Sequence, residues 1–263
     1  MQVFVELGRF AATATWAELR DMVRALEDAG AAGVSFSDHI FITEDDRPRA
    51  ESVAHTCEPL TGMAVVAGMS DRLAMQTVVM NTAWIHPALL LRPFAQLAML
   101  AGGRRVTAGL GAGWSAEEFD ALGLRMPPFQ ERMDRFAEVV AFARDLFDHR
   151  LASLAGAHVT ARQVPLSPPC PVSNQIWYAA FGDRTAIAEA ERQLCRDWAS
   201  LPARRLNSSP YLLLGEPAQI AEALTERHEA YGLDRISLTE NTGIPAAPHD
   251  PIRFCQQVVP LLP

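Results

Sequence analysis

The sequence contains no lysine, so all 23 of its basic residues are arginines, against 31 acidic residues and a formal net charge of −8. The two adjacent arginine pairs, Arg104–Arg105 and Arg204–Arg205, are isolated and too small to form a basic patch. Phosphate backbones and anionic lipid surfaces attract basic proteins and repel acidic ones. We therefore expect neither a nucleic-acid partner nor binding to an anionic membrane surface.

Cysteine is scarce as well, at four residues in 263. The four lie far apart, without CxxC spacing, at Cys57, Cys170, Cys195 and Cys255. This pattern is typical of reduced intracellular thiols rather than of a disulfide framework or a zinc site. No apolar run reaches the length of a membrane span, and the first residues lack a basic signal-peptide start. We expect a cytoplasmic protein with no metal site.

Several common catalytic motifs are missing too. The chain has no GxSxG serine motif, no HExxH zinc motif and no Walker-type GxxxxGK[ST] loop. Each motif places a nucleophile, a metal or a phosphate in a defined structural setting. Serine, metal and P-loop chemistry can therefore be set aside.

The first 150 residues alternate short apolar strands with helices. The predicted strands are 2–7, 33–37, 73–80 and 106–110, and the predicted helices are 16–29, 59–68, 88–100 and 131–147. The strands are apolar throughout rather than alternating, as expected for parallel strands that are covered on both faces. Successive βα units predict an α/β fold, either an open doubly wound sheet or a closed (βα)₈ TIM barrel. We expect the barrel.

The second half of the chain is less regular. A hairpin is predicted around 155–159, and the four prolines between 165 and 171 indicate an extended connector. Further predicted elements are strands 175–180, 198–201, 211–214 and 235–238 and helices 184–195, 217–231 and 251–259. Their short spacers predict a shortened or irregular second half, in which one βα unit is irregular or missing.

In a barrel, functional residues lie at the carboxyl ends of the strands. The second strand runs directly into Ser37, Asp38 and His39, and the third ends at Asn81. His39 is the best candidate for acid/base chemistry or for polarising a cofactor, although a structural role bonded to a neighbouring loop is an alternative. Asp38 would either orient His39 or accept hydrogen bonds from loop amides.

The fourth strand leads into the glycine-rich sequence VTAGLGAGWSAEEF. Glycines at alternate positions allow close backbone approach to a ligand, and amides at a strand-to-helix turn suit a phosphate. A tight loop that binds nothing is the alternative. Trp84 and Trp114, both at strand ends, could wall a flat aromatic ligand. Glu117 and Glu118 are expected mainly to favour the positive end of their helix.

Five stretches of the chain together resemble the luciferase-like monooxygenase superfamily, and within it the branch that uses the deazaflavin coenzyme F420. They are helix 18–30 with GVSFSDHIF, the EPLT segment at 58–61, HPALLLRPFAQLAMLAGGRRVTAGLGAGWSAEEFDALG with ERMDRFAEVVAFARDLF, AGAHVTARQVPLSPPCPVSNQIWYAAFGDR, and LLLGEPAQIAEALTERHEAYGLDRISL. The resemblance implies one barrel domain over residues 1–263, commonly homodimeric, with a hairpin and proline-rich insertion at about 151–174.

The resemblance also implies a site. His39 matches the strand-two histidine that lies against the reactive ring in deazaflavin members, and Asp38 precedes it in the same way. The coenzyme's phosphate would be held by backbone after strands four and five. The residues expected to bind the coenzyme are Ser37, Asn81, Gly109, Gly111, Ala112, Gly113, Trp114, Ala179, Ala180, Phe181, Gly182 and Arg184.

Two departures from the family pattern bear on function. Many relatives have Gly-Gly where this chain has Phe181-Gly182, and a benzyl side chain there could crowd the phosphate. Some dehydrogenase members carry an acidic proton donor where Trp114 stands, so their acid step does not transfer.

These observations leave three hypotheses. The first is an F420-dependent oxidoreductase that passes a hydride between the coenzyme and a small organic substrate. The second keeps the fold but uses FMN with oxygen. The third is a degenerate member with a binding role or a cofactor-free activity.

Overall fold

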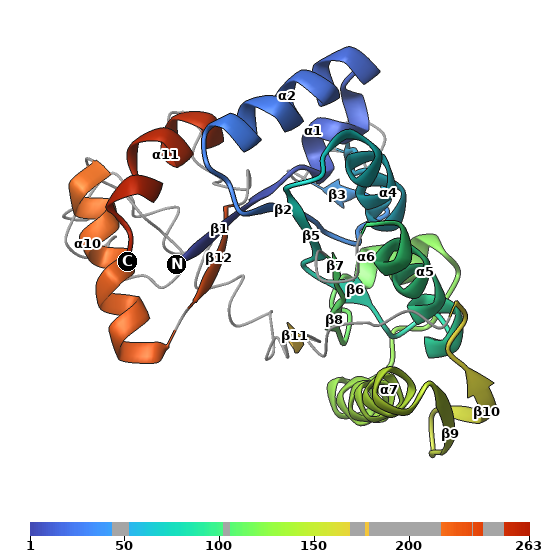
Figure 1. Cartoon of the computed structure of the whole chain (residues 1–263). Helices are drawn as coiled ribbons and strands as arrows, with labels where there is room; N and C mark the ends of the chain where they lie inside the picture. Colours follow the sequence, from blue (N-terminus) through green and yellow to red (C-terminus); the bar gives the residue numbers. More distant parts are fainter. Residues whose placement is uncertain (44–52, 102–105, 169–176, 179–216, 233, 239–249) are drawn as a thin grey trace, which may run out of the picture.

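A computed structural model of the chain describes residues 1–43, 53–101, 106–168, 177–178, 217–232, 234–238 and 250–263 (Figure 1). The elements predicted at 184–195, 198–201 and 211–214 lie outside these residues, as do the coenzyme-binding candidates from Ala179 to Arg184.

The centre of the described fold is a parallel sheet of five strands. They are β1 (Gln2–Glu6), β2 (Gly33–Phe36), β5 (Ala74–Thr77), β7 (Val106–Thr107) and β12 (Arg235–Leu238). Their order is β12-β1-β2-β5-β7, and every neighbouring pair is parallel. The last of the described strands therefore lies beside the first, as it does in a barrel and not in the common doubly wound strand orders.

A second parallel sheet continues the first toward the carboxyl ends of its strands. It contains β6 (Met80–Asn81), β8 (Gly109–Gly111) and β11 (Trp177–Tyr178), in the order β11-β8-β6. The strand predicted over 73–80 is thus interrupted into β5 and β6, and a cis peptide joins Val78 to Val79 between them. The Thr77 hydroxyl bridges this interruption by bonding both the amide and the carbonyl of Gly109.

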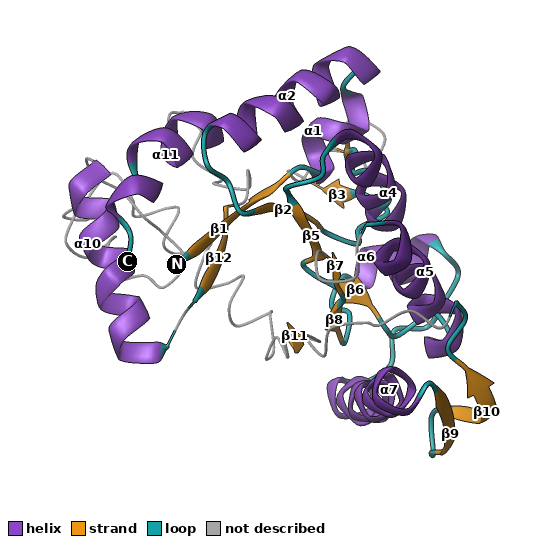
Figure 2. Ribbon diagram, in the orientation of Figure 1, coloured by secondary structure: helices purple, strands orange, loops and turns teal. Residues whose placement is uncertain are grey.

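Helices lie around the outer side of the strands (Figure 2). The longer ones are α2 (Trp16–Asp28), α4 (Pro59–Met69), α5 (Pro87–Leu100), α7 (Phe129–His149) and α10 (Pro217–Tyr231). Three shorter ones are α1 (Gly8–Thr13), α6 (Ala116–Ala121) and α11 (Pro251–Gln257), which a 3₁₀ turn, η2 (Val259–Leu261), follows. Within the described residues, the predicted helices are confirmed to within two residues at most ends, but α1 was not predicted.

Side-chain caps explain why these helices begin where they do. Thr15 and Glu18 form a reciprocal capping box at the start of α2. The Glu58 carboxylate accepts the amides of Leu60 and Thr61 at 3.0 and 2.7 Å, which starts α4 before Pro59. His86 caps α5 through Nδ1, as expected for a residue just before Pro87.

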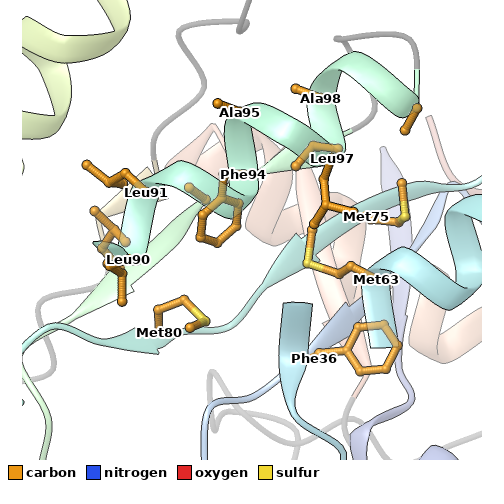
Figure 3. Close-up of a cluster of buried hydrophobic side chains, with 14 of the residues drawn as sticks. Phe36, Met63, Met75, Met80, Leu90, Leu91, Phe94, Ala95, Leu97 and Ala98 are labelled. Atoms are coloured by element: carbon orange, nitrogen blue, oxygen red, sulfur yellow. The ribbon is translucent and has the colours of Figure 1, made fainter. Parts of the chain in front are cut away.

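The core lies between the strands and the helices packed on them. Figure 3 shows α5 lying over β5, with Phe94 and Leu97 directed toward Met75 and Met63. Phe94 and Met75 are 1% and 0% exposed. Strands β1 and β2 are buried almost throughout, because helices cover their outer face and the barrel interior covers the other.

The predicted hairpin is present as β9 (Leu151–Ala155) and β10 (Thr160–Pro165), which pair antiparallel. Glu138 of α7 holds its turn, because its carboxylate accepts the amides of Ala157, His158 and Val159 at 2.8 to 3.0 Å. One helix of the barrel wall thus fixes the hairpin. A short pair, β3 (Ile42–Thr43) with β4 (Val53–Ala54), follows the second strand and was not predicted.

Candidate functional site

The candidate site lies at the rim of the barrel formed by the carboxyl ends of β2, β6 and β8. The Asn81 amide donates to the Asp38 carboxylate at 2.8 Å, which joins the end of β6 to the segment after β2. The amide and hydroxyl of Thr82 both donate to the carbonyl of Gly111 at 2.9 Å, which joins the end of β6 to β8. The predicted residues of strands two, three and four are therefore brought together.

His39 contacts Glu118, for which the sequence indicated only a role at the start of its helix. Its Nδ1 lies 3.2 Å from Oε2 of Glu118, in α6, and Oε1 of the same carboxylate accepts the amide of Ile40 at 2.6 Å. Glu118 is 2% exposed, whereas the side chain of His39 is 16% exposed. Glu118 lies in the first turn of α6, as predicted, and its carboxylate is in addition directed inward to the segment after β2.

The local sequence explains why Glu118 turns inward while Glu117 remains exposed. Ser115 caps α6 by accepting the amide of Glu118, so helical geometry begins at Ala116. Glu118 then occupies the third helical position, beside the buried Phe119. An apolar residue directly after two acids, in a helix that starts at a barrel rim, was the available sign that the second acid faces the site.

The rings of His39 and Trp114 meet edge to face, with centroids 5.4 Å apart and an interplanar angle of 73°. Trp114 is 41% exposed, so part of its ring lies open beside the histidine. Trp84, the other predicted aromatic wall, packs instead against Phe119 at 5.2 Å. Of the two predicted tryptophans, Trp114 is the one whose ring contacts His39.

Asp38 is used for the backbone of the rim. Burial raises the pKa of its carboxyl, and the hydrogen bond from the Asn81 amide and the nearby His39 only partly oppose this rise. Of the two predicted alternatives, the structure favours the acceptor of a loop amide. The residue that bonds the His39 ring is Glu118.

Ser37 is held at the same rim by another buried carboxylate. Its hydroxyl donates to Oε1 of Glu6 at 3.4 Å, and the amide of Gly8 donates to the same oxygen at 2.9 Å. Glu6 ends β1 and is 5% exposed. Sequence reasoning missed Glu6, since a polar residue at the end of an apolar strand marks the rim without indicating a partner.

The three glycines of the fourth strand have specific neighbours. A Cβ at Gly109 would lie 2.0 Å from the carbonyl oxygen of Thr77, and one at Gly111 would lie 2.4 Å from the side chain of Val79. Gly113 has φ +75°, and a Cβ there would lie 2.4 Å from Oδ1 of Asn81. The glycines at 109 and 111 are therefore required by the adjacent strand, and only Gly113 adopts a backbone conformation that favours glycine.

Among the described residues, no three His, Cys, Asp or Glu side chains gather in a way that could hold a metal ion. None of the helices in that same part combines the length and apolar character needed to cross a bilayer.

The family of the chain follows from a comparison with protein-family models. Residues 3–194 match the family described as luciferase-like monooxygenase. The chain belongs to this family. Its barrel is similar throughout to a crystal structure of a monooxygenase from Streptomyces bottropensis, with a TM-score of 0.70, 17% identity and 99% of each chain covered. Because the identity is only 17%, the similarity between this luciferase-like protein and the Streptomyces structure shows a shared fold and nothing more.

Curated relatives of this luciferase-like chain carry names that mention F420. An F420-dependent glucose-6-phosphate dehydrogenase of Beutenbergia cavernae is 30% identical over 146 residues, which are 55% of this chain and 43% of that protein. An F420-dependent hydroxymycolic acid dehydrogenase of Mycobacterium tuberculosis is 29% identical over 164 residues, 62% of this chain and 43% of that protein. The chain thus aligns with less than half the length of either relative.

Proposed function

We propose that the protein is an F420-dependent oxidoreductase that transfers a hydride between the coenzyme and a small organic substrate. The observation that carries the proposal is the rim itself, where a partly exposed histidine and a partly exposed tryptophan meet above the glycine-rich fourth strand. The F420-dependent names of the relatives support the choice of coenzyme.

The described residues fit one face of such a coenzyme. A planar ring system needs an aromatic or apolar surface beside it and a few polar groups that fix its orientation. Trp114 offers that surface, and the ring of His39 offers a nitrogen at its side. The buried Asn81 and the half-buried Asp38 are occupied with backbone amides, so they shape the rim rather than compete for a ligand.

When bound, the coenzyme supplies the carbon, C5 of the deazaflavin, that accepts or releases the hydride. The chain's part is to orient and to exclude water. His39 would polarise a substrate oxygen or exchange a proton through its Nε2 atom, the ring nitrogen that Glu118 does not contact. Trp114 would cover the reacting groups on one side and keep solvent from them.

Titration of the purified chain with oxidised and with reduced F420 tests the proposal, with absorbance and fluorescence as readouts. We expect saturable binding in the micromolar range and weaker binding by His39→Ala. His149→Ala is the matched control, because His149 is 72% exposed at the far end of α7. If neither oxidised nor reduced F420 binds at high micromolar concentration, the proposal is wrong.

The same preparation separates the two rival hypotheses. FMN that co-purifies with the protein, or that binds where F420 does not, would favour a flavin monooxygenase. Binding of neither molecule would favour the cofactor-free role. Homodimer formation stays a prediction, which the elution volume of the purified chain in size-exclusion chromatography tests.

A further inference from the structure

We infer that Glu118 is a positioning residue that fixes the His39 ring in one tautomer and one orientation. The effect of this positioning on catalysis rests on the proposed function, whereas the tautomer and orientation of the His39 ring do not depend on it. The inference starts from the two bonds of one carboxylate, with Nδ1 of His39 at 3.2 Å and with the amide of Ile40 at 2.6 Å.

These two bonds hold consecutive residues of the segment after β2. One carboxylate oxygen fixes the backbone directly after His39, and the other fixes the ring of His39 itself. Because Glu118 is 2% exposed, its charge must be compensated by donors within the protein. Among the described residues, the donors to this carboxylate are Nδ1 of His39 and the amide of Ile40. Loss of either bond would leave a buried carboxylate oxygen without a hydrogen-bond donor.

The bonding pattern sets the tautomer. An ionised carboxylate only accepts hydrogen bonds, so the His39 nitrogen that faces it must carry a proton. Nδ1 is then the protonated nitrogen in the neutral ring, and Nε2 is left with a lone pair. Nε2 lies across the ring from Glu118, so the atom available to a ligand is an acceptor until it takes up a proton.

Neighbouring acids do not offer the same contact. Asp38 accepts the Asn81 amide, and Glu117 is exposed. The carbonyl of His39 accepts the Thr56 hydroxyl, which fixes the backbone but not the ring. Ring orientation therefore depends on Glu118 and on the edge contact with Trp114.

Glu118→Gln gives a sharp test, because an amide has only one acceptor oxygen for the two donors. If that oxygen keeps the Ile40 amide, the NH₂ group faces Nδ1 and requires it to accept. The ring must then carry its proton on Nε2. Nitrogen NMR of ¹⁵N-histidine-labelled full chain distinguishes the two tautomers, and His39→Ala assigns the signal among the seven histidines.

We expect Nδ1–H in the neutral ring of the wild type and of Glu117→Gln, the matched control one residue earlier, and Nε2–H or a mixture in Glu118→Gln. An Nε2–H ring in the wild type would overturn the inference, and this measurement needs no variant beyond the one that assigns the signal.

A mutant cycle on F420 binding tests the link to function. Glu118→Gln and His39→Ala should each weaken binding by about twofold to 150-fold, the range of coupling that contacting pairs give. The double variant should be no weaker than His39→Ala, because Glu118 acts through the ring. Additive losses would overturn the link. If the wild type does not bind F420, the proposed function fails while the tautomer measurement still decides the inference.

Discussion

At the scale of single residues, the rim depends on close contacts between backbone and side chain. Asn81 is 6% exposed and its Oδ1 accepts the amide of Ala83, so it cannot move aside easily. Gly113 lies against this oxygen with a positive φ. The glycine therefore meets two demands at once, a left-handed backbone and the absence of a side chain.

Gly113→Ala should separate these demands when it is compared with Gly123→Ala. Both glycines have positive φ, at +75° and +69°, but a Cβ at Gly123 would have no atom within 4 Å. We expect Gly123→Ala to lower the free energy of unfolding by about 1 kcal/mol, the cost of the conformation alone. Gly113→Ala should lower the free energy of unfolding by more than Gly123→Ala does and should also weaken F420 binding. Denaturant unfolding and F420 titration measure the two effects. Equal effects would show that Asn81 yields freely.

At the scale of elements, α5 illustrates how burial and not residue type sets the cost of a substitution. Leu91 is 0% exposed and faces the strands, whereas Leu89, in the same helix, is 63% exposed. Both lie in the first half of α5, so their helix propensities and lost atoms are the same.

Leu91→Ala should lower the free energy of unfolding by about 2–5 kcal/mol, because it removes buried methyl groups and leaves a cavity. Leu89→Ala should change it by less than about 0.5 kcal/mol. Urea unfolding of the two variants measures the difference. A comparable loss at Leu89 would mean that the exposed side of α5 is covered in solution.

The elements also show what the sequence could and could not predict. Helix α10 has the predicted bounds because Pro217 begins it and Gly232, with a positive φ, follows its end, and strand β12 has the predicted bounds as well. Helix α1 was missed because its six residues, GRFAAT, have neither a side-chain cap nor an apolar periodicity. The contact of Glu118 with His39 joins residues 79 apart in the sequence, and no local pattern encodes such a pairing.

At the scale of the whole molecule, two carboxyls shift their pKa values in opposite directions. Burial opposes the shift at Glu138, but three amide hydrogen bonds prevail and lower its pKa. Burial raises the pKa of Asp38, and its single amide bond does not offset this. The stability of the molecule therefore contains contributions that respond to acid with opposite signs.

Glu138→Ala should lower the free energy of unfolding at pH 7 by about 1–3 kcal/mol, the loss of hydrogen bonds to a charged group. A lowered pKa stabilises the fold above the unfolded-state value of about 4.3, and this stabilisation is lost as the pH falls through the folded-state value. The difference from wild type should therefore shrink in acid. Glu226→Ala, at an exposed site of α10, is the control and should have little effect at either pH.

Asp38→Asn should behave in the opposite way. A raised pKa favours folding below the unfolded-state value of about 3.9, and this advantage is lost as the pH rises. The neutral amide keeps an oxygen for the Asn81 amide and removes the buried charge. We expect a higher midpoint of unfolding than wild type at pH 7 and no difference near about pH 3. A lower midpoint at pH 7 would show that the charged carboxylate is needed for the rim.

The edge contact between His39 and Trp114 has an optical consequence. An imidazolium ring quenches the fluorescence of an indole that it touches, whereas neutral imidazole does so weakly. Emission from Trp114 should therefore dim when His39 becomes charged, and Trp114→Phe isolates this change from the emission of the other four tryptophans. If the emission changes in this way, the tryptophan reports the charge of its neighbouring ring without any added dye.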